Sequence, residues 1–195
     1  MRSADAGRTV RRGPWSLLDL VLVATIGVSC GALFAGWNIL WGVASPLFAT
    51  VLPLQYLLFA GTWVIAGPLA GLILRRPGAA LAGELIAASV SFLLASQWSI
   101  DALLSGAAQG LGAEIAFALF LYRRFTPLTA LLAGALSGCG MALHDLPLYF
   151  ADVDRSFALL LAAAMISSSA LVGGIGALLI MRALRRSGAL EALGA

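Results

Sequence analysis

The sequence predicts an all-α integral membrane protein, folded as one bundle of six transmembrane helices. Three observations lead to this class. The chain has 195 residues, of which 61% are hydrophobic and only 11% charged, whereas a soluble domain carries about 25% charged residues. Its apolar segments are long and rich in Leu, Ala and Gly, and they do not alternate as the strands of a membrane β-barrel do. At roughly 20 apolar residues per span, the length accommodates six helices with short loops.

The apolar runs place the six spans in chain order. They are expected at about 17–42, 53–74, 78–98, 101–122, 128–150 and 157–182. Residues 1–13 are expected to form a disordered arm, residues 14–186 the membrane domain and residues 187–195 a short tail. The first apolar run is long enough to span and lacks a small-residue cleavage site, so we expect a membrane helix there and not a cleaved signal.

The arginines determine the expected orientation of the bundle. All 12 basic residues are arginine, and eleven of them lie before the first span or after an even-numbered one; the exception is Arg155. Positively charged residues concentrate on the cytoplasmic side of membrane proteins. Both termini are therefore predicted to be cytoplasmic, and the net charge of +3 requires no nucleic-acid partner.

Three acidic side chains fall inside predicted spans, namely Glu84 in the third, Glu114 in the fourth and Asp145, beside His144, in the fifth. A charged group near the bilayer centre costs roughly 2.5–3.5 kcal/mol on insertion scales, so it usually faces a cavity or another polar group. Small residues share the helical face of each acid, which leaves room for a closely packed helix or for a ligand. One interpretation is hydrogen bonding between helices; the other is a ligand or ion site.

Aromatic and amide side chains complete a candidate ligand site. Trp63 lies near the middle of the second span, away from the interfaces where membrane tryptophans gather, and Tyr56 lies closer to the outer end. Trp37 and Asn38 occupy the outer end of the first span, where Trp37 fits either an interfacial belt or a site wall. Gln109 of the fourth span is a further polar candidate, or else a link between helices. Carboxylates beside aromatic faces suit an organic cation or a planar heteroaromatic ring.

Small residues form a stripe along the first span. Gly27, Gly31 and Ala35 recur at four-residue steps, a spacing that lets helices pack backbone to backbone in lipid. The stripe indicates either internal packing or a docking face for a partner membrane subunit.

Catalysis and metal binding find little support in the sequence. His144 is the only histidine, so an ordinary metal site lacks ligands, and we find no nucleotide-binding motif. We expect no catalytic residue, no metal and no cofactor. A membrane enzyme built around His144 and the acidic residues is the weakest alternative.

Two strings of the sequence are distinctive, namely Arg75-Arg76-Pro77-Gly78-Ala79-Ala80 ahead of Glu84, and Gln109-Gly110-Leu111-Gly112-Ala113-Glu114. With them the chain resembles the YkoE family, the substrate-binding S components of energy-coupling-factor (ECF) vitamin transporters. The resemblance implies a bacterial plasma-membrane protein that captures thiamine or its hydroxymethylpyrimidine (HMP) precursor from outside. It also implies partners, a transmembrane T subunit and two ATPase subunits or domains, which hydrolyse ATP in place of this chain.

The resemblance also implies roles for the candidate residues. Glu84 and Glu114 would contact the pyrimidine or balance the thiazolium charge. Trp63, Tyr56 and Trp37 would stack on the rings. Secondary polar contacts would come from Asn38, Gln109, His144 and Asp145, and T-subunit docking from Gly27, Gly31 and Ala35.

Two questions stay open at this point. A third span starting at Gly78 puts Glu84 about 9 Å from its inner end at 1.5 Å per residue, so Glu84 serves either the ligand or the coupling to partners. A stand-alone ion-coupled secondary transporter of a small organic cation would also use buried carboxylates, and it is the alternative function.

Overall fold

The computed structural model describes residues 14–95 and 98–192, and within these ranges it contains helices and no strand. The predicted all-helical class is confirmed. The predicted disordered arm, residues 1–13, lies outside the described residues, as does the end of the tail from residue 193.

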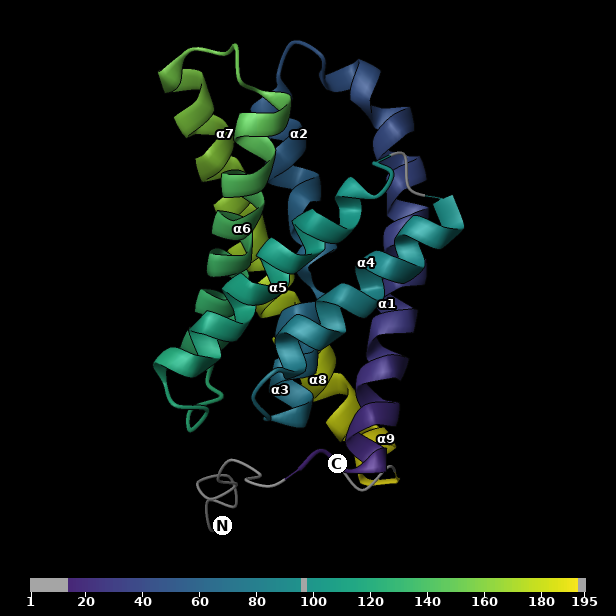
Figure 1. Ribbon diagram of the computed structural model, residues 1–195. Coiled ribbons are helices and arrows are strands. Elements are labelled where there is room, and N and C mark those ends of the chain that lie inside the picture. Colours follow the sequence, from purple (N-terminus) through teal and green to yellow (C-terminus); the bar gives the residue numbers. More distant parts are fainter. Residues whose placement is uncertain (1–13, 96–97, 193–195) are drawn as a thin grey trace.

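Six helical segments follow one another with short loops (Figure 1). Five of them are long and apolar enough to cross a membrane, and the apolar helix α4 is shorter. In chain order the elements are α1 (Leu17–Ala44), η1 (Ser45–Phe48), α2 (Leu52–Phe59), η2 (Ala60–Val64), α3 (Ala66–Leu74), α4 (Ala79–Ala95), α5 (Asp101–Leu119), α6 (Pro127–Tyr149), α7 (Arg155–Ser168), η3 (Ser169–Ile175), α8 (Gly176–Arg186) and α9 (Ala189–Ala192).

Side-chain caps explain where several helices begin. Ser16 caps α1 by accepting a hydrogen bond from the Asp19 amide, and the Asp19 carboxylate accepts one from the Ser16 amide at 2.8 Å. Such reciprocal bonds satisfy helix N–H groups that have no partner in the first turn. The Asp19 carboxylate also pairs with Arg76 at 2.9 Å, which ties the start of α1 to the loop between α3 and α4.

The second and sixth spans both depart from α-helical geometry near mid-height, and the two irregular segments touch. The second span contains the 3₁₀ segment η2, and the sixth contains the π-helical segment η3. The Gly61 amide donates to Ser168 Oγ at 2.9 Å, and a Cβ at Gly61 would lie 2.3 Å from the Ser168 carbonyl oxygen. Glycine is therefore required for this close approach.

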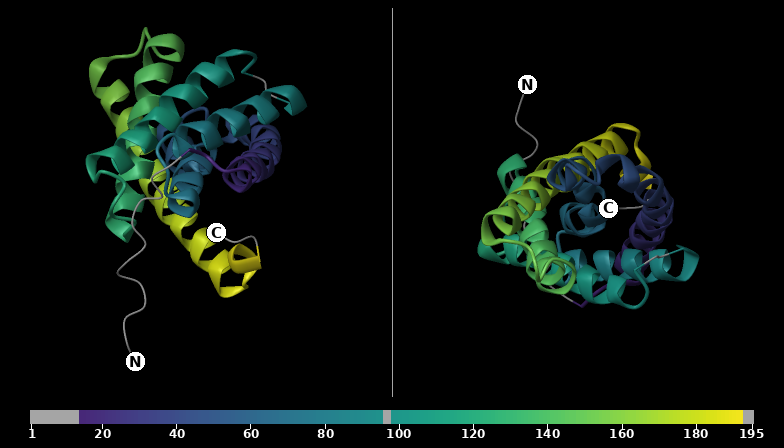
Figure 2. Two further views of the ribbon diagram at one scale, coloured as in Figure 1. Left: turned by 60° about the horizontal axis from the view of Figure 1, so that its bottom comes forward. Right: turned by 90° about the horizontal axis from the view of Figure 1, so that it is seen from above.

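The break in the second span brings α3 into the centre of the bundle. Every residue of α3 is buried, and the helix packs against α1, α4, α5 and α8. Seen from above, the other helices form a ring around this part of the chain (Figure 2). The first turn of α3 therefore lies at mid-height inside the protein, where its free N–H groups can reach a side chain of a neighbouring helix.

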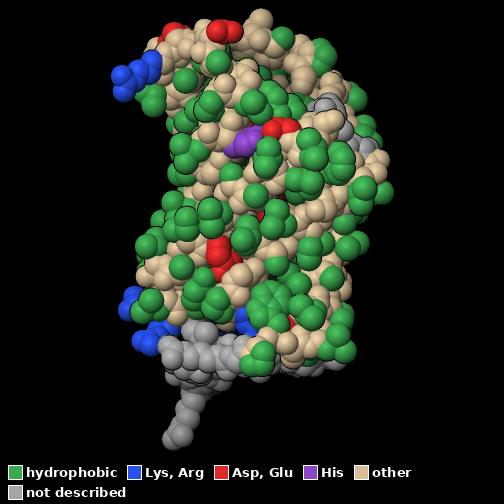
Figure 3. All heavy atoms as spheres, viewed as in Figure 1, with side chains coloured by type: hydrophobic (Ala, Val, Ile, Leu, Met, Phe, Trp, Pro, Cys, Tyr) green, Lys and Arg blue, Asp and Glu red, His purple; other side chains and the backbone are tan. Residues whose placement is uncertain are grey.

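The outer surface has the character expected of a multi-pass membrane protein. Large hydrophobic side chains such as Leu93, Leu143 and Leu159 are well exposed. Hydrophobic side chains spread over most of the visible face, and basic side chains gather mainly at its lower end (Figure 3). Lipid tails would cover such a surface, since a soluble protein rarely exposes so large an apolar area.

Candidate functional site

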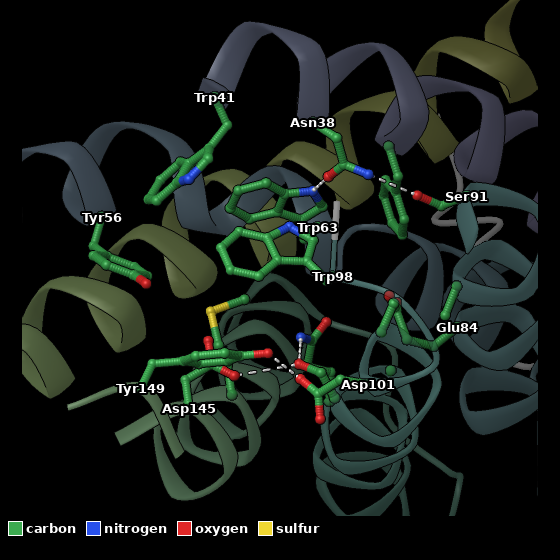
Figure 4. Close-up of a pocket in the computed structure, with 17 residues that line it drawn as sticks. Asn38, Trp41, Tyr56, Trp63, Glu84, Ser91, Trp98, Asp101, Asp145 and Tyr149 are labelled. Atoms are coloured by element: carbon green, nitrogen blue, oxygen red, sulfur yellow. Dashed lines mark hydrogen bonds between the residues drawn. The ribbon is translucent and has the colours of Figure 1, made fainter. Parts of the chain in front are cut away.

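A pocket lies at the end of the bundle where α1 and α6 finish and α2 and α5 begin (Figure 4). Its space measures about 620 Å³ with the open solvent at its mouth included. Its polar and aromatic lining comprises Phe34, Asn38, Trp41, Tyr56, Trp63, Glu84, Ser91, Trp98, Asp101, Ser105, Gln109, Asp145 and Tyr149.

Glu84 forms the floor of this pocket. Its side chain is 1% exposed, and its Oε2 accepts a hydrogen bond from the Gly67 amide at 2.7 Å. The other oxygen, Oε1, is buried and has no hydrogen-bond partner among the described residues. A buried polar atom without a partner is rare in folded proteins, so this oxygen is the atom of the pocket best suited to accept a hydrogen bond from a ligand.

An aromatic wall stands beside the floor. The ring of Trp41 lies 5.0 Å from those of Tyr56 and Trp63 and 6.5 Å from that of Trp98, in tilted or edge-to-face contacts. Because these rings support one another, they offer a preformed surface on which a planar or cationic ligand can lie.

Asn38 fixes the orientation of Trp63. Its side-chain oxygen accepts a hydrogen bond from the Trp63 indole N–H at 2.9 Å, and its amide nitrogen donates to Ser91 Oγ at 3.1 Å (Figure 4). Both ends of the Asn38 amide are thus occupied by protein groups. This side chain links α1, η2 and α4 around the pocket.

An acidic network surrounds the mouth. The ring nitrogens of His144 lie 3.1 Å from an oxygen of Asp101 and 2.9 Å from one of Asp145. Tyr149 donates its hydroxyl to the other oxygen of Asp101. On α5, the Gln109 side chain donates a hydrogen bond to Ser105 Oγ at 2.7 Å, and Ser105 Oγ donates to Asp145 at 3.5 Å. The network joins α5 to α6 along one side of the pocket.

Glu114 does not line the pocket, and its expected contact with a ligand stays a prediction. Its carboxylate accepts hydrogen bonds from the backbone amides of Gly78, Ala80 and Leu81 at 2.6, 3.0 and 3.2 Å, and from the Tyr122 hydroxyl at 2.6 Å. The three amides belong to the first turn of α4 and the residue before it, whereas Tyr122 follows α5. Glu114 therefore caps α4, the helix that carries Glu84.

Two other candidate residues lie beside the pocket without lining it. The indole of Trp37 donates to the Phe59 carbonyl at 3.0 Å and packs on the Phe59 ring, so it supports the aromatic wall from behind. His144 is likewise outside the lining, where it bridges the two aspartates. Their expected ligand contacts stay predictions, and in the structure both side chains support lining residues.

The small-residue stripe of the first span packs inside the protein, as one of its two interpretations expects, and its use for partner docking stays a prediction. A Cβ at Gly27 would meet Ile86 Cβ at 2.6 Å, and one at Gly31 would meet Val90 Cβ at 2.6 Å. Ala35 is buried as well. The stripe is the seam along which α1 packs on α4.

Sequence reasoning missed part of the lining. Four lining residues are absent from the candidates that the sequence offers, namely Trp41, Trp98, Asp101 and Tyr149. A tryptophan at the end of a span is ordinarily expected in an interfacial belt. All four lie near helix ends, and only the tertiary packing turns them toward one another.

Three comparisons with known proteins agree with this architecture. The family model described as "ABC-type cobalt transport system, permease component" matches residues 18–140. The "Putative HMP/thiamine permease protein YkoE" of Bacillus subtilis (strain 168) is 27% identical over 162 residues, which are 83% of this chain and 80% of that protein. A structure described as "Crystal structure of an S-component of ECF transporter" superposes with a TM-score of 0.77 at 24% identity, covering 92% of this chain and 90% of the other.

Proposed function

Since the chain belongs to the family of ABC-type cobalt transport system permease components and has the fold of an ECF transporter S component, we propose that it captures thiamine or HMP outside the cell. As an S component it binds its substrate and is not an enzyme. The ligand class is suggested by the name of the B. subtilis relative and by the chemistry of the pocket.

The observation that carries this proposal is the unpartnered Oε1 of Glu84 beside the aromatic wall. Thiamine and HMP share an aminopyrimidine, whose amino group can donate to this oxygen. The flat ring can lie against Trp63 and its neighbours. In thiamine the thiazolium adds a positive charge, which aromatic faces and carboxylates stabilise.

The proposed orientation puts the mouth of the pocket outside. Asp101 and Tyr149 lie at the mouth, whereas the loops that carry Arg75, Arg76, Arg123 and Arg124 lie at the opposite ends of their helices. By the positive-inside rule those loops face the cytoplasm. The ligand would therefore enter from outside, and delivery inward would depend on a T subunit and two ATPase subunits or domains.

Thiamine titration of the purified protein in detergent, followed by tryptophan fluorescence, tests the proposal. We expect saturable quenching with one site per chain, because tryptophans line the pocket, and competition by HMP ranks the two ligands. No response from folded protein to either compound would overturn the vitamin assignment. Uptake in vesicles without ATPase partners would instead favour an ion-coupled secondary transporter.

A further inference from the structure

The pocket has carboxyl groups at both ends and lacks a compensating cation of fixed charge. Its described lining includes the carboxylates Glu84, Asp101 and Asp145, and none of those lining residues is Lys or Arg. The arginines of two loops lie at the other end of the bundle, namely Arg75 and Arg76 between α3 and α4, and Arg123 and Arg124 between α5 and α6. An anionic group on a ligand would therefore meet carboxylates wherever it lay in the pocket.

The trio Asp101, His144 and Asp145 holds two carboxyl groups and one imidazole. Each ring nitrogen of His144 faces a carboxylate oxygen. With both carboxyl groups ionised, a charged imidazole offsets one of them and a neutral imidazole offsets neither. The trio therefore presents net negative charge to the pocket.

Depth separates the trio from the floor. The side chains of Asp101 and Asp145 are 21% and 14% exposed, whereas Glu84 is 1% exposed. A ligand that donates to Glu84 with one end therefore directs its other end toward the trio. In thiamine that other end is the thiazolium with its hydroxyethyl group, whose hydroxyl can donate to a carboxylate.

We propose that Asp101 and Asp145 make this pocket selective for the free alcohol and exclude its phosphate ester. A phosphate monoester carries about −1.5 to −2 charges near pH 7, and it would replace a hydrogen-bond donor with an anion beside the trio. Placing like charges together is a common means of rejecting a wrong partner. This inference rests on the proposed function, because it assumes that the pyrimidine end occupies the floor.

Paired titrations of the purified, full-length protein test the inference. Thiamine is compared with thiamine monophosphate by tryptophan fluorescence at one ionic strength. We expect the ester to bind at least about 100-fold more weakly than the alcohol, since like-charge contacts cost several kcal/mol. In the double variant Asp101→Asn/Asp145→Asn, the ratio of the ester Kd to the alcohol Kd should shrink about tenfold or more.

Asp152→Asn is the matched control, because it removes the same charge from an exposed loop position outside the lining. We expect it to leave the ester-to-alcohol ratio unchanged. The single variant Asp101→Asn, which retains the His144–Asp145 pair, serves if the double variant does not fold, and it should also reduce the ratio.

Two results would overturn the inference, and they are distinguishable. If the wild-type protein binds alcohol and ester within about threefold, or if the folded variants keep the full ratio, the selectivity does not come from these aspartates and the proposed function stands. If the folded wild-type protein binds neither thiamine nor HMP, the proposed function itself fails and the inference with it.

Discussion

The carboxylate of Glu84 on α4 accepts a hydrogen bond from the backbone amide of Gly67, 2.7 Å away in the first turn of α3. The first N–H groups of a helix have no partner inside it, so the break in the second span supplies this donor at mid-height. A Cβ at Gly67 would lie 3.2 Å from Glu84 Oε2, which leaves little space for a side chain. The contact holds one oxygen of Glu84, and the other has no hydrogen-bond partner among the described residues.

Replacing Glu84 tests whether its free oxygen accepts a hydrogen bond from the ligand. We expect Glu84→Gln to weaken thiamine binding about 10- to 100-fold, because hydrogen bonds to charged groups contribute roughly 1.5–3 kcal/mol. A glutamine oxygen can still accept from the Gly67 amide, so the fold should be retained. Fluorescence titration of the purified variant measures the change.

Glu114→Gln is the comparison for this experiment, since Glu114 lies outside the pocket. Its folded fraction should bind thiamine nearly as the wild-type protein does. The opposite pattern, with affinity lost in Glu114→Gln and kept in Glu84→Gln, would contradict our site and return Glu84 to a role in coupling.

The second prediction concerns Asn38, whose amide is held between Trp63 and Ser91. We expect Asn38→Ala to weaken binding by about three- to tenfold, because the Trp63 ring loses the bond that orients it. A double-mutant cycle with Trp63→Phe, measured by isothermal titration calorimetry, separates this effect from direct contact. If Asn38 acts through Trp63, its replacement should have little further effect in the Trp63→Phe background. An undiminished loss there would show that Asn38 contacts the ligand itself.

Long apolar runs and buried acids were enough to predict the helical class and several pocket residues. Glu84 and Asp145 stand out because a carboxyl group inside a span requires a partner or a cavity. Trp63 stands out because it is a tryptophan far from either interface. These signals depend on depth in the membrane, and depth can be counted along a sequence.

The different fates of Glu84 and Glu114 could not be predicted in this way. Each is an acidic residue among small neighbours within a span, and the sequence places both inside the bilayer. What separates them is the loop between α3 and α4, where Arg75 and Gly78 adopt positive φ angles of 54° and 85°. That turn directs backbone amides at Glu114, whereas the break in the second span directs only one amide at Glu84.

The third prediction follows from the four donors around Glu114. We expect Glu114→Ala to destabilise the protein by about 3 kcal/mol, because three backbone amides and the Tyr122 hydroxyl lose their acceptor. Tyr122→Phe removes only one of these bonds and should destabilise by about 1 kcal/mol. Thermal unfolding in detergent measures the melting temperatures, which should fall from the wild-type protein to Tyr122→Phe and further to Glu114→Ala. Equal melting temperatures for Glu114→Ala and the wild-type protein would show that this cap does not hold α4.

The fourth prediction tests whether the stripe on α1 is an internal seam. At Gly31 a new methyl group would lie 2.6 Å from Val90 Cβ and 2.7 Å from the Ala87 carbonyl oxygen, and the backbone atom cannot move aside easily. We therefore expect Gly31→Ala to destabilise the isolated protein by about 1–3 kcal/mol, as overpacking of a core does.

Gly36 provides the matched control on the same helix, because nothing lies within 4 Å of the Cβ that an alanine would add there. Glycine inside a helix is less stable than alanine by roughly 0.5–1 kcal/mol, so Gly36→Ala should leave the melting temperature unchanged or raise it slightly. If Gly31→Ala instead melts like the wild-type protein but no longer copurifies with a T subunit, the stripe serves docking. A lowered melting temperature for Gly31→Ala alone, measured without any partner, would establish that α1 and α4 pack along this seam.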